Sequence, residues 1–252
     1  MDRNATKGSN RVAQPREKRR EGMRNIVSAA LILVFIPAVI AVGLTQWDNR
    51  RYYIVSMLII LLSMVPFVLV FEKRRPKARE LVLIAVMTAI AVAGRAAFYL
   101  VPQFKPIAAI VIITGVSLGS EAGFLTGALT AFVSNMFFGQ GPWTPWQMFA
   151  LGILGFLSGL IFRKEIKTKF QLIMLCVYGA FVTFAVYGVI ADTSSFFMNG
   201  SQPTWAALLS VYASGVVFNA IHAASTFVFL FVLTKPFLNK IKRIKIKYGL
   251  NE

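Results

Sequence analysis

Apolar runs of about 20 residues, separated by short clusters of charged residues, divide most of this sequence into segments. At a rise of about 1.5 Å per residue, a helix of that length crosses a hydrocarbon core about 30 Å thick. Hydrophobic residues make up 57% of the chain and charged residues 15%, whereas soluble domains are about 45–50% apolar. The sequence therefore predicts an all-α fold, a polytopic bundle of membrane helices.

Eight membrane spans are expected, two in an N-terminal extension (residues 26–71) and six in a membrane domain (residues 81–234). They are residues 26–47, 52–71, 81–101, 106–118, 122–138, 146–162, 170–191 and 208–234. The fourth has only about 13 apolar residues, too few to cross a bilayer alone. Basic segments flank these units: an N-terminal tail (1–25), a linker (72–80) and a C-terminal tail (235–252).

The positive charge is concentrated at the ends of the predicted spans. The formal net charge is +17, and 23 of the 27 Lys and Arg residues lie before residue 26, in 72–80, in 163–169 or after residue 234. In an alternating topology these segments share one side, which the positive-inside rule places in the cytoplasm. We expect a multi-pass protein of the cell membrane with both termini cytoplasmic. Anionic lipid headgroups account for the basic ends, and no nucleic-acid partner is expected.

Polar residues in two of the predicted spans are candidates for a functional role. Arg95 lies outward of the middle of its span, where its side chain either faces a cavity or reaches the outer headgroups. Asp192 is its candidate counter-ion. Asn219 and His222 are three residues apart on one helix face. Substrate contact and an interhelical hydrogen bond are equally open for Asn219, whereas the hydrogen bond is favoured for His222.

The sequence shows no set of residues typical of a catalytic site or a metal site. One His, one Cys (Cys176) and no paired intramembrane carboxylates leave no predicted metal site, catalytic residue or cofactor. The chain lacks a Gly-rich nucleotide loop ending in Lys, and no acidic residue lies at mid-depth to couple transport to protons. The sequence predicts a protein that is not an enzyme and that needs a partner for uphill transport. A lipid-modifying enzyme and a non-transporting scaffold or sensor are the alternatives.

One uncharged stretch, NMFFGQGPWTPWQM (residues 135–148), interrupts the helical pattern. Two Gly and two Pro shape its backbone, and Trp143 and Trp146 supply large aromatic surfaces. Together with residues 103–105 and 192–205 it is predicted to form one outer surface. We interpret it as part of a binding pocket, because an interfacial aromatic belt would not need two Gly and two Pro.

A row of small residues marks the span at residues 81–101. Ala85, Ala89 and Ala93 recur at every fourth position, and Ala97 continues the row. Small residues at this spacing let another helix approach closely in a membrane. The row predicts a surface for docking a partner helix, although packing within one bundle also produces such rows.

The segments AVMTAIAVA, GRAAFYLVPQFKP and SEAGFLTGALTAFVSNMFFGQGPWTPWQMFALG resemble the substrate-binding S components of energy-coupling factor (ECF) vitamin transporters. The resemblance covers residues 79–240 and is to the cobalamin-type branch. It implies that the chain binds a vitamin, cobalamin or a related micronutrient, from outside. It also implies docking, through Ala85, Ala89 and Ala93, onto a membrane coupling protein driven by two ATPase subunits. Residues 1–71 depart from the six-span pattern of that family.

Taken together, the polar and aromatic residues near the predicted outer surface form the candidate substrate site. Its residues are Arg95, Tyr99, Gln103, Phe104, Asn135, Phe138, Gln140, Trp143, Trp146, Gln147 and Asn219.

Overall fold

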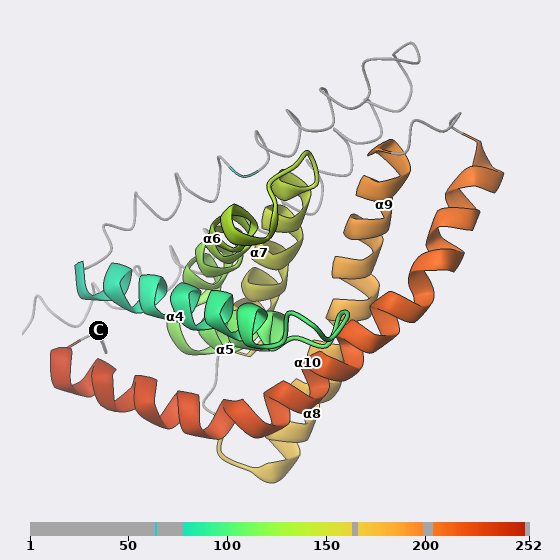
Figure 1. Cartoon of the computed structure of the whole chain (residues 1–252). Helices are drawn as coiled ribbons and strands as arrows, with labels where there is room; N and C mark the ends of the chain where they lie inside the picture. Colours follow the sequence, from blue (N-terminus) through green and yellow to red (C-terminus); the bar gives the residue numbers. More distant parts are fainter. Residues whose placement is uncertain (1–63, 65–77, 163–165, 199–203, 250–252) are drawn as a thin grey trace, which may run out of the picture.

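A computed structural model describes residue 64 and residues 78–162, 166–198 and 204–249, and these residues form helices joined by short turns, without a β-strand. The helices are α4 (Ala78–Ala97), α5 (Ile107–Leu118), α6 (Ser120–Phe138), α7 (Thr144–Ile161), α8 (Lys169–Val182), the π-helical segment η2 (Thr183–Tyr187), α9 (Gly188–Met198) and α10 (Trp205–Tyr248). Their arrangement is shown in Figure 1. The predicted N-terminal tail and the two N-terminal spans lie outside the described residues, apart from Met64.

Four helical segments of the described chain are long and apolar enough to cross a membrane. They are Ala78–Ala97, Thr144–Ile161, Lys169–Met198 and Trp205–Tyr248. The predicted short span corresponds to α5, which has 12 residues. Only Gly119, with a φ of 106°, separates α5 from α6. The chain is therefore a multi-pass helical membrane protein, and the short helix α5 forms a tight helical hairpin with α6.

Glycines allow the backbones of α5, α6 and α7 to touch. A Cβ added at Gly123 would lie 2.6 Å from the carbonyl oxygen of Gly155, and one added at Gly159 would lie 2.6 Å from the carbonyl oxygen of Gly115. Small residues are the usual means of close helix packing in membranes, where burying apolar surface gives little driving force between helices. These contacts fix α5 and α6 against α7 and so fix the loops at their ends.

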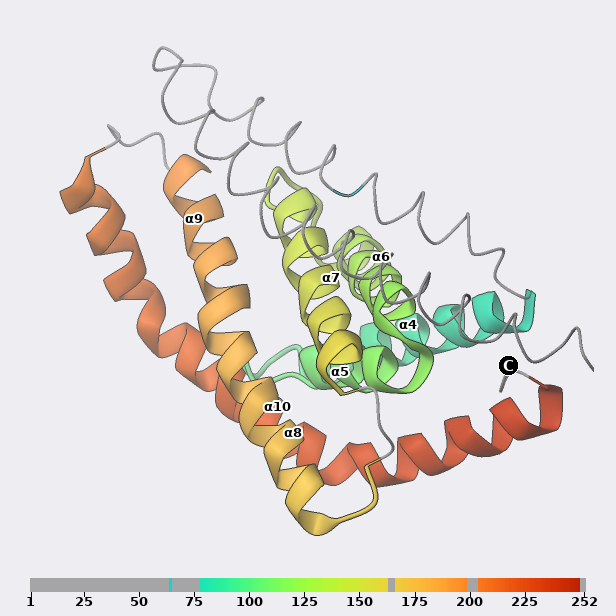
Figure 2. The same cartoon turned by 180° about the vertical axis from the view of Figure 1, so that it is seen from behind.

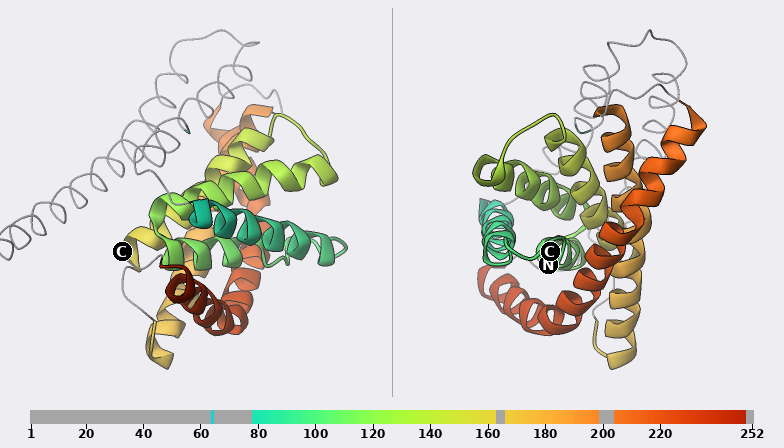
Figure 3. Two further views of the ribbon diagram at one scale, coloured as in Figure 1. Left: turned by 90° about the vertical axis from the view of Figure 1, so that its left-hand side faces the viewer. Right: turned by 45° about the vertical axis from the view of Figure 1, so that its right-hand side comes forward.

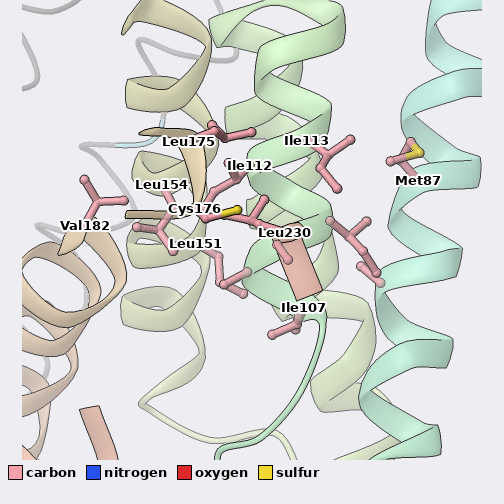
Figure 4. Packing of buried hydrophobic residues seen from close by; sticks show 14 of the residues in the cluster. Met87, Ile107, Ile112, Ile113, Leu151, Leu154, Leu175, Cys176, Val182 and Leu230 are labelled. Carbon is pink, nitrogen blue, oxygen red and sulfur yellow. The ribbon is translucent and has the colours of Figure 1, made fainter. Parts of the chain in front are cut away.

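A continuous apolar core joins this group to α8 and α10. Ile112, Leu154, Leu175 and Leu230 are fully buried and come from four different helices. Figure 4 shows these side chains around Cys176, which is a buried member of the same cluster. Cys176 therefore has a packing role in the core.

The predicted outer loop at residues 192–205 is wrong for its first half, because α9 continues to Met198. Hydroxyl groups in this stretch donate back to carbonyl oxygens of the same helix. Thr193 bonds to Val189, and Ser194 and Ser195 both bond to Ala191. Polar residues can stay helical here because their hydrogen bonds are satisfied locally.

The last helix is much longer than the predicted span at residues 208–234. α10 has 44 residues, and most of the predicted C-terminal tail is helical up to Tyr248. Pro236 lies inside it, where a proline removes one backbone hydrogen bond and bends the helix. The first part of α10 runs beside α9, and the last part turns towards the start of α4 (Figures 1 and 2). Two further views in Figure 3 show the same change of direction.

Candidate substrate-binding site

Arg95, in the last turn of α4, connects that helix to the end of α6. Its Nη1 atom donates to Ser134 Oγ at 2.6 Å and to Asn135 Oδ1 at 2.8 Å. The predicted counter-ion, Asp192, instead accepts a hydrogen bond from Asn219 Nδ2 at 2.8 Å. Arg95 is therefore bonded to two neutral side chains, Ser134 and Asn135, instead of to the predicted counter-ion Asp192.

Asn135 lies at the centre of a hydrogen-bond network and is fully buried. Its Nδ2 group donates to Thr144 Oγ1 at 3.0 Å and to Gln147 Oε1 at 2.9 Å. Thr144 Oγ1 also accepts from the backbone N–H of Gly141 at 3.3 Å. The network joins α4, the end of α6, the connecting turn and the start of α7. Three of the predicted site residues, Arg95, Asn135 and Gln147, are thus brought together.

Aromatic rings cover one side of this network. The rings of Tyr99 and Phe138 are stacked with centroids 5.0 Å apart, and the Arg95 guanidinium carbon lies 5.0 Å from the centre of the Phe138 ring. Such cation–π contacts orient a guanidinium without neutralising it. Tyr99 and Phe138 therefore extend the polar network with a flat aromatic surface.

The two tryptophans of the turn have different environments. Trp143 is 39% exposed, and a Cβ added at Gly141 would collide with its indole ring, so Gly141 is needed for the ring to lie where it does. Trp146 is 3% exposed and stacks on Phe197 of α9 with centroids 5.9 Å apart. Trp143 remains available at the surface, whereas Trp146 packs in the core between α7 and α9.

Gln140, in the same turn, lies at the exposed rim, and its Nε2 donates to the carbonyl of Phe132 at 3.1 Å. It is therefore placed beside the network without joining it.

The turn between α4 and α5 is attached to α10. Phe104 packs against Phe98 and against Phe229, with ring centroids 6.4 and 5.4 Å apart. Ser225 Oγ donates to the carbonyl of Lys105 at 2.9 Å. Burial lowers the pKa of the Lys105 amine, and the positive charge of Arg95 lowers it further. Lys105 and Arg95 are therefore close enough for their positive charges to repel each other.

Gln103 is exposed with a φ of 56°, and Phe104 belongs to the α10 contact rather than to the Arg95 network.

Asn219 and His222 belong to a separate contact between α10 and the preceding helices. Gly188 of α9 leaves room for Asn219, and a Cβ there would lie 2.7 Å from its amide nitrogen. His222 is buried, with its ring edge-on to Tyr187 of η2 at 4.8 Å. Asn219 thus makes the interhelical hydrogen bond that the sequence left open. Contact of either residue with substrate stays a prediction.

The alanine row lies on the exposed side of α4. Ala85, Ala89 and Ala93 are exposed, while Leu83, Ile84, Met87, Thr88 and Ala91 face the bundle. Internal packing of the described helices therefore does not account for the row. Docking onto a partner remains a prediction.

Sequence reasoning missed Ser134 and Thr144 in the network, and it missed Tyr187, Phe197 and Phe229, which contact His222, Trp146 and Phe104. Ser134 and Thr144 flank predicted residues in the same segment, so their hydroxyl groups were the available signal. The three aromatic residues have no local signal, because their positions depend on how distant helices pack. Among the described residues, no group of three His, Cys, Asp or Glu side chains is placed to hold a metal ion.

Comparison with known proteins identifies the family of the chain. Residues 75–242 match the model of a family described as "ECF-type riboflavin transporter, S component". A UPF0397 protein from Vibrio atlanticus (strain LGP32) is 32% identical over 130 residues, which cover 48% of this chain and 70% of that protein. No solved structure matches. These matches support an ECF S component and do not confirm the cobalamin-type branch. Two thirds of the chain, including every helix of the network, falls in the matched region, and the protein belongs to the ECF-type riboflavin transporter S component family.

Proposed function

We propose that this protein binds a flat, heteroaromatic vitamin from outside the cell, with riboflavin as the first candidate, and delivers it through an ECF complex. The observation that carries the proposal is the network of Arg95, Asn135 and Gln147 beside the stacked rings of Tyr99 and Phe138. Amide and guanidinium groups can hydrogen-bond the carbonyl and ring nitrogen atoms of such a ligand, and the aromatic rings can cover its faces.

The description of the matched family names riboflavin, and this supports a flavin over the cobalamin that the sequence resemblance implied. The stacked rings of Tyr99 and Phe138 and the nearby amide groups also suit a flat polar ring system such as an isoalloxazine. Cobalamin remains the second ligand to test. With either vitamin, the S component supplies the substrate specificity, and an ECF coupling protein and ATPases complete the transporter.

Trp143 is the residue we assign to closing the site. It is partly exposed, lies in the turn that leads into α7, and follows directly from the segment that holds Asn135. Removing its ring should weaken binding by about 1–3 kcal/mol, the scale of burying a large side chain. Trp205, which is 81% exposed at the start of α10, provides a matched control for loss of a tryptophan.

Isothermal titration calorimetry on the purified full chain tests the proposal, with riboflavin and cobalamin as separate titrants. We expect saturable binding of riboflavin by the wild type and by Trp205→Ala, and weaker binding by Trp143→Ala. Binding of cobalamin without binding of riboflavin would instead assign the protein to the cobalamin-type branch. Equal affinity in all three proteins would show that Trp143 is a membrane anchor outside the site.

A further inference from the structure

The terminal segment of α10, residues 235–248, lies at the opposite end of the bundle from the Arg95 network. After Pro236 the helix leaves the direction of its first part, and its last residues lie near the start of α4 (Figures 1 and 2). Lys245 Nζ donates to the carbonyl of Ser117 at the end of α5 at 3.0 Å. Arg79, at the start of α4, donates to the carbonyl of Tyr248 at 2.9 Å. The end of α5 and the start of α4 therefore each hold the segment by one hydrogen bond.

One face of this segment is apolar and packs on the bundle. Ile241 is buried, and Phe237 and Leu238 pack against the main core. The other face is basic. Its exposed cationic residues are Lys235, Lys240, Lys242, Arg243 and Lys247. Ile246, 60% exposed, lies among them, and α10 contains no acidic residue. The segment is thus an amphipathic helix with a cationic outer face.

The length of α10 predicts that this face lies at the level of the lipid headgroups. The part of α10 before Lys235 has about 30 residues and a length of about 45 Å, enough to cross the hydrocarbon core. A straight continuation would carry the remaining 14 or so residues about 20 Å away from the membrane. The bend and the contacts with Ser117 and Arg79 instead keep the segment against the end of the bundle.

We propose that the terminal segment of α10 binds anionic phospholipids, with the five exposed basic side chains contacting headgroup phosphates and Ile246 inserting among the lipids. Cationic amphipathic helices bind anionic membrane surfaces in this way. A lipid is favoured over an acidic protein because an exposed isoleucine lies between the cations and because the segment runs along the end of a membrane bundle. The family match ends at residue 242, so the last part of this surface lies beyond the matched region.

Native mass spectrometry of the full chain in a neutral detergent, titrated with phosphatidylglycerol or phosphatidylcholine, tests the proposal. The test variant carries Lys235→Gln, Lys240→Gln, Arg243→Gln and Lys247→Gln. A control variant carries Lys235→Arg, Lys240→Arg, Arg243→Lys and Lys247→Arg, which change the same four side chains and keep their charge. Helicity and gel-filtration profile establish that each variant is folded.

We expect the wild type and the control to retain phosphatidylglycerol in preference to phosphatidylcholine. The test variant should bind phosphatidylglycerol at least about tenfold more weakly, since each cation near an anionic surface contributes severalfold. Equal retention by both variants, or equal loss in both, would overturn the proposal. Displacement by equimolar inorganic phosphate would indicate a phosphate site instead.

Discussion

At the scale of single residues, Asn135 has three side-chain hydrogen bonds to lose. Its side-chain oxygen accepts from Arg95, and its amide group donates to both Thr144 and Gln147. All three bonds are in a buried or partly buried environment, where an unpaired polar group is costly. The residue therefore organises the candidate site as well as contributing to it.

Replacing this side chain should destabilise the protein. Asn135→Ala leaves Gln147 and Arg95 each without one partner, and we expect the free energy of unfolding to fall by about 1–3 kcal/mol. Gln140→Ala is the matched control, because this exposed amide has one bond to a backbone carbonyl and should cost less than about 0.5 kcal/mol. Denaturant titration in detergent, followed by circular dichroism, measures both. Similar losses would show that the network does not stabilise the fold.

At the scale of helices, the contacts between α6 and α7 depend on glycine. Gly155 of α7 touches the backbone of Gly123, whereas Gly152, one turn earlier, faces the ring of Phe124. A methyl group at Gly155 must separate two backbones, while one at Gly152 can be accommodated by movement of a side chain. The same substitution at two neighbouring positions therefore distinguishes backbone contact from side-chain contact.

We expect Gly155→Ala to lower the free energy of unfolding by about 1–3 kcal/mol, the usual cost of overpacking, and Gly152→Ala to cost less. The measurement is again unfolding in detergent. A larger loss for Gly152→Ala would mean that α6 and α7 are not held together by the contact between their glycines.

The alanine row on α4 leads to a prediction about transport. Ala89→Trp places a large ring on the exposed face where a partner helix is proposed to dock, so uptake by the complete ECF complex should be lost while vitamin binding remains. Val217→Trp, on the exposed side of α10, adds comparable bulk away from the row. Radiolabelled uptake and calorimetry on the same variants separate the two activities. Loss of binding in Ala89→Trp would assign the row to the fold of the bundle.

At the scale of the whole molecule, the two ends of the bundle differ chemically. One end gathers the Arg95 network and the stacking of Trp146 on Phe197, and the other carries Arg79 and the basic terminal segment of α10. The charge rule predicts a cytoplasmic position for the basic end, and the candidate site would then open outside. Nothing in the sequence supplies a nucleotide loop to drive movement between the ends.

The isolated chain in liposomes should therefore bind its vitamin without accumulating it. Addition of an ECF coupling protein and ATPases with ATP should produce accumulation, because energy enters through these subunits. Uptake against a gradient by the chain alone, driven by a proton gradient, would contradict this expectation.

The sequence by itself determined the class of the protein, the approximate positions of the described helices and the likeness to ECF S components, though not the branch, because hydropathy, charge clusters and short motifs are local properties. It predicted Arg95, Asn135 and Gln147 as site residues because polar groups and glycines stand out in an apolar chain. Only the tertiary structure decided which groups pair: Asn135 rather than Asp192 with Arg95, and Trp146 with Phe197 in the core. It also decided the bend of α10, since the apolar face of residues 235–248 finds its partner on helices distant in the sequence. Pairing depends on which helices become neighbours, and that is settled by backbone contacts between glycines and by buried hydrogen bonds rather than by local pattern.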